Sequence, residues 1–295
     1  MTSTIGTATA DDGIVLRTRH WTPPGGSSEP AAAVLLVHGI AEHSGRWEHV
    51  GEQLASEGLD VHAFDMRGFG ASAGRRTHVR VFDEYYRDLA ARLAAVRAAA
   101  PGRPVVLYGH SLGGLIALGY VLRLATTAGA PGRPVPDLLV LSAPGLDSTI
   151  PRWKIQLARL LGRVVPTFVI PSRVAGELLS RDPTVGQRYH ADPLVVHGAT
   201  AGFGAAALAE QVWVRSSLGA LTIPTLVLHG EADELVPPAA SAPLGDVAGV
   251  TRRTYPGLRH ELHNEPEGRS IVSDVITWIR GRSGPEHSGR GSGTG

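Results

Sequence analysis

The chain has 295 residues, of which 43% are hydrophobic and 19% are charged, and its formal net charge at pH 7 is +1. This composition is typical of a soluble globular protein with one large core, long enough to carry a modest insertion. The near-zero charge argues against the basic surface by which proteins bind nucleic acids, so we expect no nucleic-acid partner. The absence of cysteine excludes disulfides and thiolate metal sites and is consistent with a reducing compartment.

The beginning of the chain carries no pattern typical of a secretory signal. Residues 1–5 contain neither the basic nor the apolar segment that such a signal requires. The longest apolar stretch, around residues 31–37, is far too short to span a bilayer. We therefore expect a cytoplasmic protein, with any membrane contact limited to the surface.

Short apolar runs alternate with helical segments along much of the chain. Ile14 to Leu16, after the turn Asp12-Gly13, indicate an opening hairpin. Continuous apolar runs, as expected of strands buried on both faces, occupy residues 33–37, 61–64, 105–107, 138–141 and 225–228. Helical spacing is found at residues 47–56, 82–99 and 112–125. This alternation predicts a mostly parallel central sheet with helices on both faces.

The alternation stops at residues 144–222, where no strand is predicted. We interpret this segment as a lid inserted into a core of residues 1–143 and 223–283. The Gly- and Ser-rich residues 284–295 are predicted to be a disordered tail. Within the lid, residues 148–176 combine basic and large apolar side chains with no acidic residue. Two interpretations stay open: a peripheral membrane contact, or a helix that covers the active site with its arginines in water.

A candidate nucleophile, Ser111, lies in the pentapeptide Gly109–Gly113, between a predicted strand and a predicted helix. A serine on such a sharp turn holds its hydroxyl clear of the backbone, and the flanking glycines avoid collisions across the turn. The pentapeptide Gly70–Gly74 has the same pattern around Ser72, but no strand precedes it and no apolar helix follows it. We therefore predict that Ser111 is the nucleophile of an acyl-transfer reaction.

A serine nucleophile needs a histidine that accepts its proton and a carboxylate that orients the histidine. In this type of fold their order along the chain is serine, acid, histidine. Asp233, shortly after a predicted strand, is the favoured acid, and Asp147, after the preceding strand, is the alternative. His260 and His263 both lie in the loop where the base is expected, and spacing alone does not choose between them.

The negative charge that develops on the substrate oxygen needs two preorganised donors, typically backbone N–H groups. We expect these at Leu112, directly after the nucleophile, and at Ile40, in the turn after the strand at 33–37. The two histidines at 260 and 263 are three residues apart, not the four of a helical zinc motif, and no Walker loop is present. We expect no cofactor and no metal.

These motifs closely resemble those of the monoacylglycerol lipase group of α/β-hydrolases, also grouped with serine aminopeptidase-like lysophospholipases. The resemblance runs along nearly the whole chain and rests on residues 38–47, 65–70, 109–114, 180–183, 189–193, 229–233 and 260–266. It implies an α/β-hydrolase fold, with His260 as the base and His263 facing the alcohol part of the substrate. Trp47 departs from the pattern, because many relatives carry tyrosine there.

The same resemblance implies that Glu42, Arg46 and Tyr189 form a polar cluster at the glycerol end of the substrate. We therefore expect a serine esterase that cleaves monoacylglycerols, a lipid ester substrate, into fatty acid and glycerol through an acyl-enzyme. The alternatives are a lysophospholipase or a broad-specificity carboxylesterase. A non-catalytic binding protein of the same fold is disfavoured because all three triad positions are filled.

Overall fold

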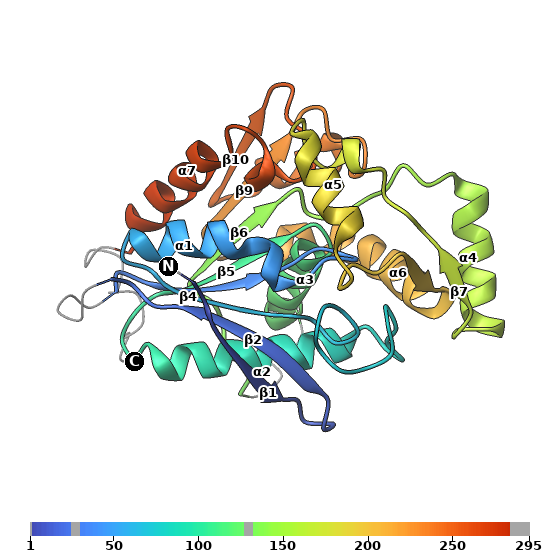
Figure 1. Cartoon of the computed structure of the whole chain (residues 1–295), viewed down its shortest axis with the longest axis horizontal. Coiled ribbons are helices and arrows are strands. Elements are labelled where there is room, and N and C mark those ends of the chain that lie inside the picture. The colour runs from blue at the N-terminus through green and yellow to red at the C-terminus, as the bar shows by residue number, and fades with distance from the viewer. Residues whose placement is uncertain (1, 25–29, 127–131, 284–295) are drawn as a thin grey trace.

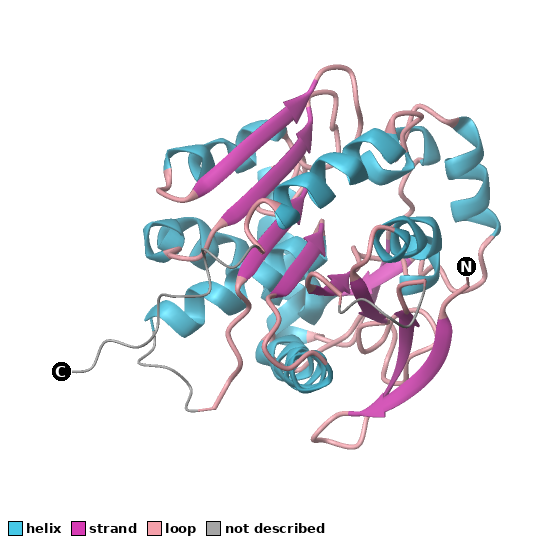
Figure 2. Ribbon diagram, turned by 90° about the vertical axis from the view of Figure 1, so that its left-hand side faces the viewer, coloured by secondary structure: helices cyan, strands magenta, loops and turns pink. Residues whose placement is uncertain are grey.

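The computed structural model describes residues 2–24, 30–126 and 132–283. Its main feature is an eight-stranded sheet of order β1-β2-β4-β3-β5-β6-β9-β10. Neighbouring strands from β4 to β10 run parallel, whereas β2 is antiparallel to both β1 and β4. Figures 1 and 2 show this twisted sheet between helices. The predicted architecture, a mostly parallel sheet with helices on both faces, is confirmed.

The predicted strands lie close to their expected positions. The strands are β1 (Thr4–Thr9), β2 (Val15–Trp21), β3 (Ala33–Val37), β4 (Asp60–Phe64), β5 (Val105–His110), β6 (Leu138–Ser142), β9 (Thr225–Gly230) and β10 (Val250–Tyr255). The opening hairpin, β1–β2, turns at Gly13, which has the left-handed φ of 83° that glycine tolerates best. β10 has no continuous apolar run, because it is an edge strand whose side chains are all only half-buried.

Two apolar cores hold the helices against the two faces of the sheet. Helices α2 (Asp83–Ala99) and α3 (Leu112–Thr126) pack on one face, and α1 (Glu48–Ser56) and α7 (Gly268–Arg280) pack on the other. Figure 1 shows the two pairs on opposite sides of the strands. The predicted helices at 82–99 and 112–125 are confirmed, and the one predicted from residue 47 begins as a 3-10 turn at Ser44–Trp47.

Between β6 and β9 the chain forms α4 (Arg152–Val164), α5 (Pro183–Ala191) and α6 (Ala201–Ser217). In Figure 1 these helices lie to the right of the sheet, with α4 outermost. The expectation that this segment lacks strands is wrong, because β7 (Val169–Pro171) pairs antiparallel with β8 (Gly198–Thr200). Strands of three residues are too short to leave a periodic pattern in the sequence.

No helix within the described ranges is long and apolar enough to cross a membrane. The tail predicted at 284–295 lies outside the described residues. The turns that follow the carboxyl ends of the parallel strands carry the predicted catalytic residues: Ser111 after β5, Asp233 after β9 and His260 after β10. The parallel topology therefore brings three distant parts of the chain to one edge of the sheet.

Candidate active site

Ser111 occupies a strained turn between β5 and α3. Its φ of 51° lies in the left-handed region that favours glycine. A Cβ added at Gly109 would collide with the backbone of Gly113, and one added at Gly113 would collide with the carbonyl oxygen of Val37. The predicted strand-turn-helix arrangement is confirmed, as is the need for glycine on both sides of the serine.

Ser72, the alternative serine, has a different environment. Its hydroxyl donates a hydrogen bond to the carbonyl oxygen of Asp65 at 2.6 Å and accepts one from the backbone N–H of Arg17 at 2.8 Å. The loop that contains Ser72 is not followed by a helix until α2 begins at Asp83. Ser72 therefore ties this loop to β2, and its hydroxyl is engaged on both sides.

Asp233 is the carboxylate that contacts His260. Its Oδ2 lies 2.7 Å from Nδ1 of His260, and its Oδ1 accepts backbone hydrogen bonds from Leu235 and Val236, each at 2.9 Å. Asp147, the alternative acid, instead forms an ion pair of 2.7 Å with Arg215 and is half-exposed. The geometry therefore separates the two acids that the sequence left as candidates.

The electrostatics of this pair suit a general base. Burial would raise the pKa of Asp233, but hydrogen bonds from His229 and His260 outweigh it and lower that pKa well below its usual range. Burial would lower the pKa of His260, but the hydrogen bond and charge of Asp233 outweigh it and raise that pKa above 6.5. The ionised carboxylate keeps the proton on Nδ1 of His260, which leaves Nε2 free to accept another.

His229, which the sequence analysis did not single out, helps to hold Asp233. This buried histidine is the last residue but one of β9, and its Nε2 lies 3.2 Å from Oδ2 of Asp233 and 3.0 Å from the carbonyl oxygen of Val236. Because both neighbours are acceptors, Nε2 carries the proton. On the other side of the ring, Nδ1 lies 2.8 Å from Oγ of Ser241. The sequence signal for this role is weak, since it consists only of a histidine at a strand end.

The two predicted oxyanion donors belong to turns next to Ser111. Leu112 begins α3, where the first N–H groups have no acceptor within the helix. Ile40 follows β3, which is paired with β5 in a register that sets Val37 opposite Gly109, and it lines the same pocket as Ser111. At Gly39 an added Cβ would lie 3.1 Å from Cβ of Ser111, so the turn approaches the serine closely. Their role as donors stays a prediction.

The three residues of the predicted polar cluster meet around Arg46. Its guanidinium lies 3.0 Å from Glu42 and 5.0 Å from the centre of the Tyr189 ring. It also pairs with both carboxylate oxygens of Glu261, at 2.6 and 2.8 Å. Glu42 further accepts hydrogen bonds from Gly39 N–H at 2.5 Å and from the Trp47 indole at 3.2 Å.

Glu261 is a second residue that the sequence analysis missed. It is buried, lines the pocket of Ser111 and His260, and directly follows that histidine in the chain. Burial would raise its pKa, but the positive charge of Arg46 outweighs it and lowers that pKa, whereas burial raises the pKa of Glu42. Glu261 is therefore the ionised partner of Arg46.

His263 lies apart from the pocket of Ser111. Its ring stacks on Trp47, with 3.9 Å between ring centres, and it lines a neighbouring cavity of about 770 Å³. Burial lowers its pKa well below the usual range, so the ring is neutral. The expectation that it faces the alcohol part of a substrate stays a prediction, and Glu261 occupies the pocket wall instead.

The pocket that contains Ser111 and His260 is small. Its volume is about 30 Å³, and its other lining residues are Gly39, Ile40, Glu42, His110, Val174, Leu179, Tyr189, Leu235 and Glu261. Val174, Leu179 and Tyr189 come from the segment between β6 and β9, which therefore closes the pocket from above the strand ends.

Known proteins match this chain along most of its length. The family described as serine aminopeptidase, S33, matches residues 28–267. The monoacylglycerol lipase of Mycolicibacterium smegmatis is 37% identical over 265 residues, covering 88% of this chain and 90% of that protein. The human monoglyceride lipase is 33% identical over 282 residues, covering 92% of this chain and 89% of that protein. The crystal structure of Paleococcus ferrophilus monoacylglycerol lipase superposes with a TM-score of 0.79 at 29% identity, covering 90% of this chain and 98% of that one.

We predict that Asp233→Asn lowers kcat for ester hydrolysis on the order of 10⁴-fold, because an amide no longer fixes the tautomer of His260. The matched variant Asp147→Asn removes a carboxylate of the same size from a half-exposed ion pair and should change kcat less than about twofold. Steady-state hydrolysis of an aryl ester by both purified variants checks this. An inactive Asp147→Asn beside an active Asp233→Asn would reverse the assignment.

Proposed function

Because this chain belongs to the serine aminopeptidase S33 family and has its α/β-hydrolase fold, we propose that this serine hydrolase cleaves monoacylglycerols into fatty acid and glycerol. The observation that carries the proposal is the 2.7 Å contact between Asp233 and His260, in a pocket that Ser111 and His260 line together. Relatives named for this activity cover most of the chain and support the substrate class.

In the proposed reaction, Oγ of Ser111 attacks the ester carbonyl carbon while Nε2 of His260 accepts its proton. The N–H groups of Ile40 and Leu112 hold the resulting oxyanion. As the tetrahedral intermediate collapses, the bond to the glycerol oxygen breaks and His260 donates the proton to that oxygen. Water, activated by His260, then hydrolyses the acyl-enzyme and releases the fatty acid. Asp233 stabilises the imidazolium at each step.

We propose that the cluster of Glu42, Arg46, Tyr189 and Glu261 binds the glycerol hydroxyls. Here two carboxyl groups surround one guanidinium in a buried wall, so no positive charge is left over. The phosphate of a lysophospholipid would face Glu261 with little water between the like charges, which is costly. A neutral polyol can donate hydrogen bonds to the carboxylates at no such cost, and this supports a monoacylglycerol over a lysophospholipid.

We further propose that residues 144–222 act as a lid that moves during catalysis. The pocket of Ser111 and His260 is narrow and is lined by Val174, Leu179 and Tyr189 of this segment, so a movement of the segment opens space for an acyl chain. The outermost helix, α4, exposes 58% of Leu160 and 70% of Val164, and its Arg163 is exposed as well. Exposed apolar side chains beside arginines suit the surface of an anionic membrane.

The exposed apolar side chains of α4 support the membrane-contact interpretation. If the segment only covered the active site, these side chains would face the pocket and not the solvent. Contact would deliver a lipid ester directly to the pocket. We propose a cytoplasmic protein that binds membranes peripherally and reversibly.

A substrate panel tests the proposed function. We predict that kcat/KM is highest for a monoacylglycerol when compared with a triacylglycerol, a lysophospholipid and an aminoacyl amide.

Ser111→Ala should lower kcat on the order of 10⁶-fold. Ser72→Ala should leave kcat nearly unchanged but destabilise the fold by about 1–3 kcal/mol, because a buried carbonyl and a half-buried N–H lose their partner. Equal losses of activity in both variants, or a preference for the lysophospholipid, would contradict the proposal.

We predict that Tyr189→Phe lowers kcat/KM for a monoacylglycerol about tenfold but leaves an aryl ester of the same acyl chain unaffected. The variant loses only a hydroxyl at the polar end of the pocket, and a hydrogen bond there matters only to a substrate with free hydroxyls. The matched control is Tyr120→Phe, which removes a hydroxyl that donates to the carbonyl oxygen of Pro134 away from the pocket. A parallel decrease on both substrates would mean that Tyr189 does not contact the alcohol.

Vesicle co-sedimentation tests the lid. In an inactive Ser111→Ala background, we predict that Leu160→Ser with Val164→Ser weakens binding to anionic vesicles at least about tenfold, because their apolar contact with lipid is lost. The control Val81→Ser alters a side chain that is also exposed, at 54%, but lies outside the lid. Binding should also fall as salt increases. If the Ser111→Ala protein, the double lid variant and the Val81→Ser control bind vesicles equally, the segment only covers the active site.

A further inference from the structure

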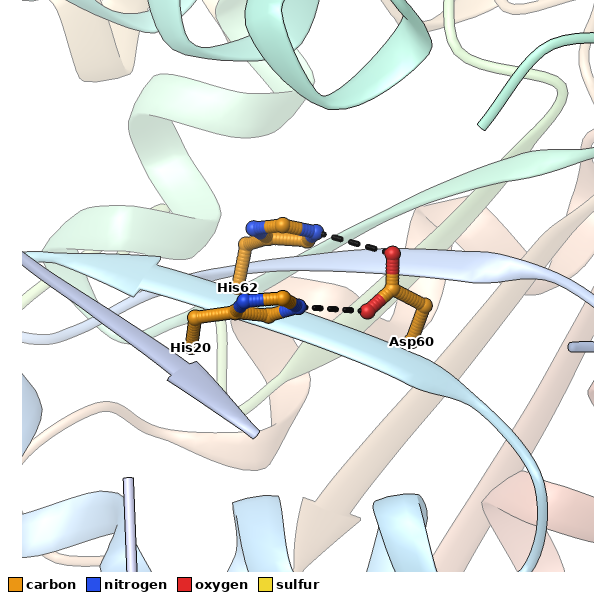
Figure 3. Close-up of side chains that lie close together, drawn as sticks. All are labelled: His20, Asp60 and His62. Carbon is orange, nitrogen blue, oxygen red and sulfur yellow. Dashed lines mark hydrogen bonds and ion pairs between the residues drawn. The ribbon is translucent and has the colours of Figure 1, made fainter. Parts of the chain in front are cut away.

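A cluster of two histidines and an aspartate lies on the sheet outside the catalytic site. His20 is on β2, and Asp60 and His62 are on β4 (Figure 3). The antiparallel register sets His20 directly opposite His62, and Asp60, two residues before His62, projects from the same face. Backbone pairing therefore brings the three side chains together.

The donor atoms of the cluster converge. Nε2 of His20 lies 2.6 Å from Oδ1 of Asp60, and Nε2 of His62 lies 3.1 Å from Oδ2 of the same carboxylate. The two imidazole rings are nearly parallel, with 4.2 Å between their centres and an angle of 9° between their planes. All three ligand atoms lie within 4.8 Å of one another. Figure 3 shows both rings directed at the two carboxylate oxygens.

We propose that His20, Asp60 and His62 form a binding site for a divalent zinc-like ion. Two imidazole nitrogens and one carboxylate oxygen are a ligand set that Zn²⁺ prefers, with a water molecule in the fourth position. Two ligands bound tetrahedrally at about 2.1 Å from one ion lie about 3.4 Å apart. The present spacings, from 2.6 Å up to at most 4.8 Å, differ from this by no more than about 1.4 Å, which side-chain rotation accommodates. The His20 side chain is 39% exposed and gives the ion a path from solvent.

The position of the cluster separates it from catalysis. Asp60 begins β4, whereas the proposed catalytic residues follow the opposite, carboxyl ends of the parallel strands. In the sheet order, the β1–β2 hairpin joins the remaining strands only through β4. An ion shared by β2 and β4 would therefore fasten this hairpin to the sheet, and its effect would be on stability and not on turnover.

The test uses the untagged full chain after treatment with EDTA and removal of the chelator. We expect calorimetric titration with ZnCl₂ to show one tight site per chain, and Tm to rise by about 5 °C at a hundredfold excess over Kd. MgCl₂ should produce no such shift, because Mg²⁺ prefers an all-oxygen shell. Ester hydrolysis should be equal in the metal-free and zinc-loaded protein.

The variants His20→Gln and His62→Gln should each weaken zinc binding at least about a hundredfold and abolish the shift in Tm. The control His190→Gln removes a histidine of α5, a helix outside the eight-stranded sheet, and should bind zinc as the unchanged chain does. If a variant does not fold, the absorption spectrum of the unchanged chain with Co²⁺ decides the question, because tetrahedral ligation has a characteristic intensity. If the unchanged chain does not bind zinc, or if both cluster variants bind it as tightly as the unchanged chain does, the cluster is only a hydrogen-bonded triad.

Discussion

The left-handed turn at Ser111 is the constraint on which the catalytic end of this molecule depends. A non-glycine residue in this conformation costs about 1–3 kcal/mol, which the surrounding structure must offset. Here the carbonyl of Ser111 accepts hydrogen bonds from Leu115 and Gly145, and its N–H donates to Ser142, so β6 and α3 both hold the turn. Close packing of glycines against neighbouring backbone leaves no room for the turn to relax. The hydroxyl is thereby fixed at the strand ends.

Buried charge shapes the pocket beside this turn. Arg46 lies between Glu42 and Glu261, and all three side chains are at least nine-tenths buried. Removing such charges from water is costly, and their mutual attraction offsets that cost only because the guanidinium meets Glu261 with two parallel hydrogen bonds. These paired charges hold the three side chains in fixed positions. In the proposed reaction, they form a preorganised polar wall for a hydroxylated leaving group.

The strand order explains how these features come together and why others stay apart. Parallel strands bring the turns after β3, β5, β9 and β10 to one edge, where Ser111, Asp233 and His260 meet. The antiparallel pairing of β2 with β4 instead brings His20 beside Asp60 and His62 near the other end of β4. One sheet thus carries the proposed catalytic site and the proposed metal site without a shared residue. Each follows from the direction in which its strands run.

The sequence by itself determined the buried strands, the helices between them and the strand-turn-helix position of the candidate nucleophile, because these depend on local periodicity and on glycines around a sharp turn. It did not decide between Asp233 and Asp147, since both follow strands and only folding shows which carboxylate reaches His260. Nor did it reveal Glu261 or the β7–β8 pair, because burial and pairing depend on residues far along the chain. Local patterns carry information about backbone conformation. Contacts between distant segments, and the pKa values that depend on them, arise only in the tertiary structure.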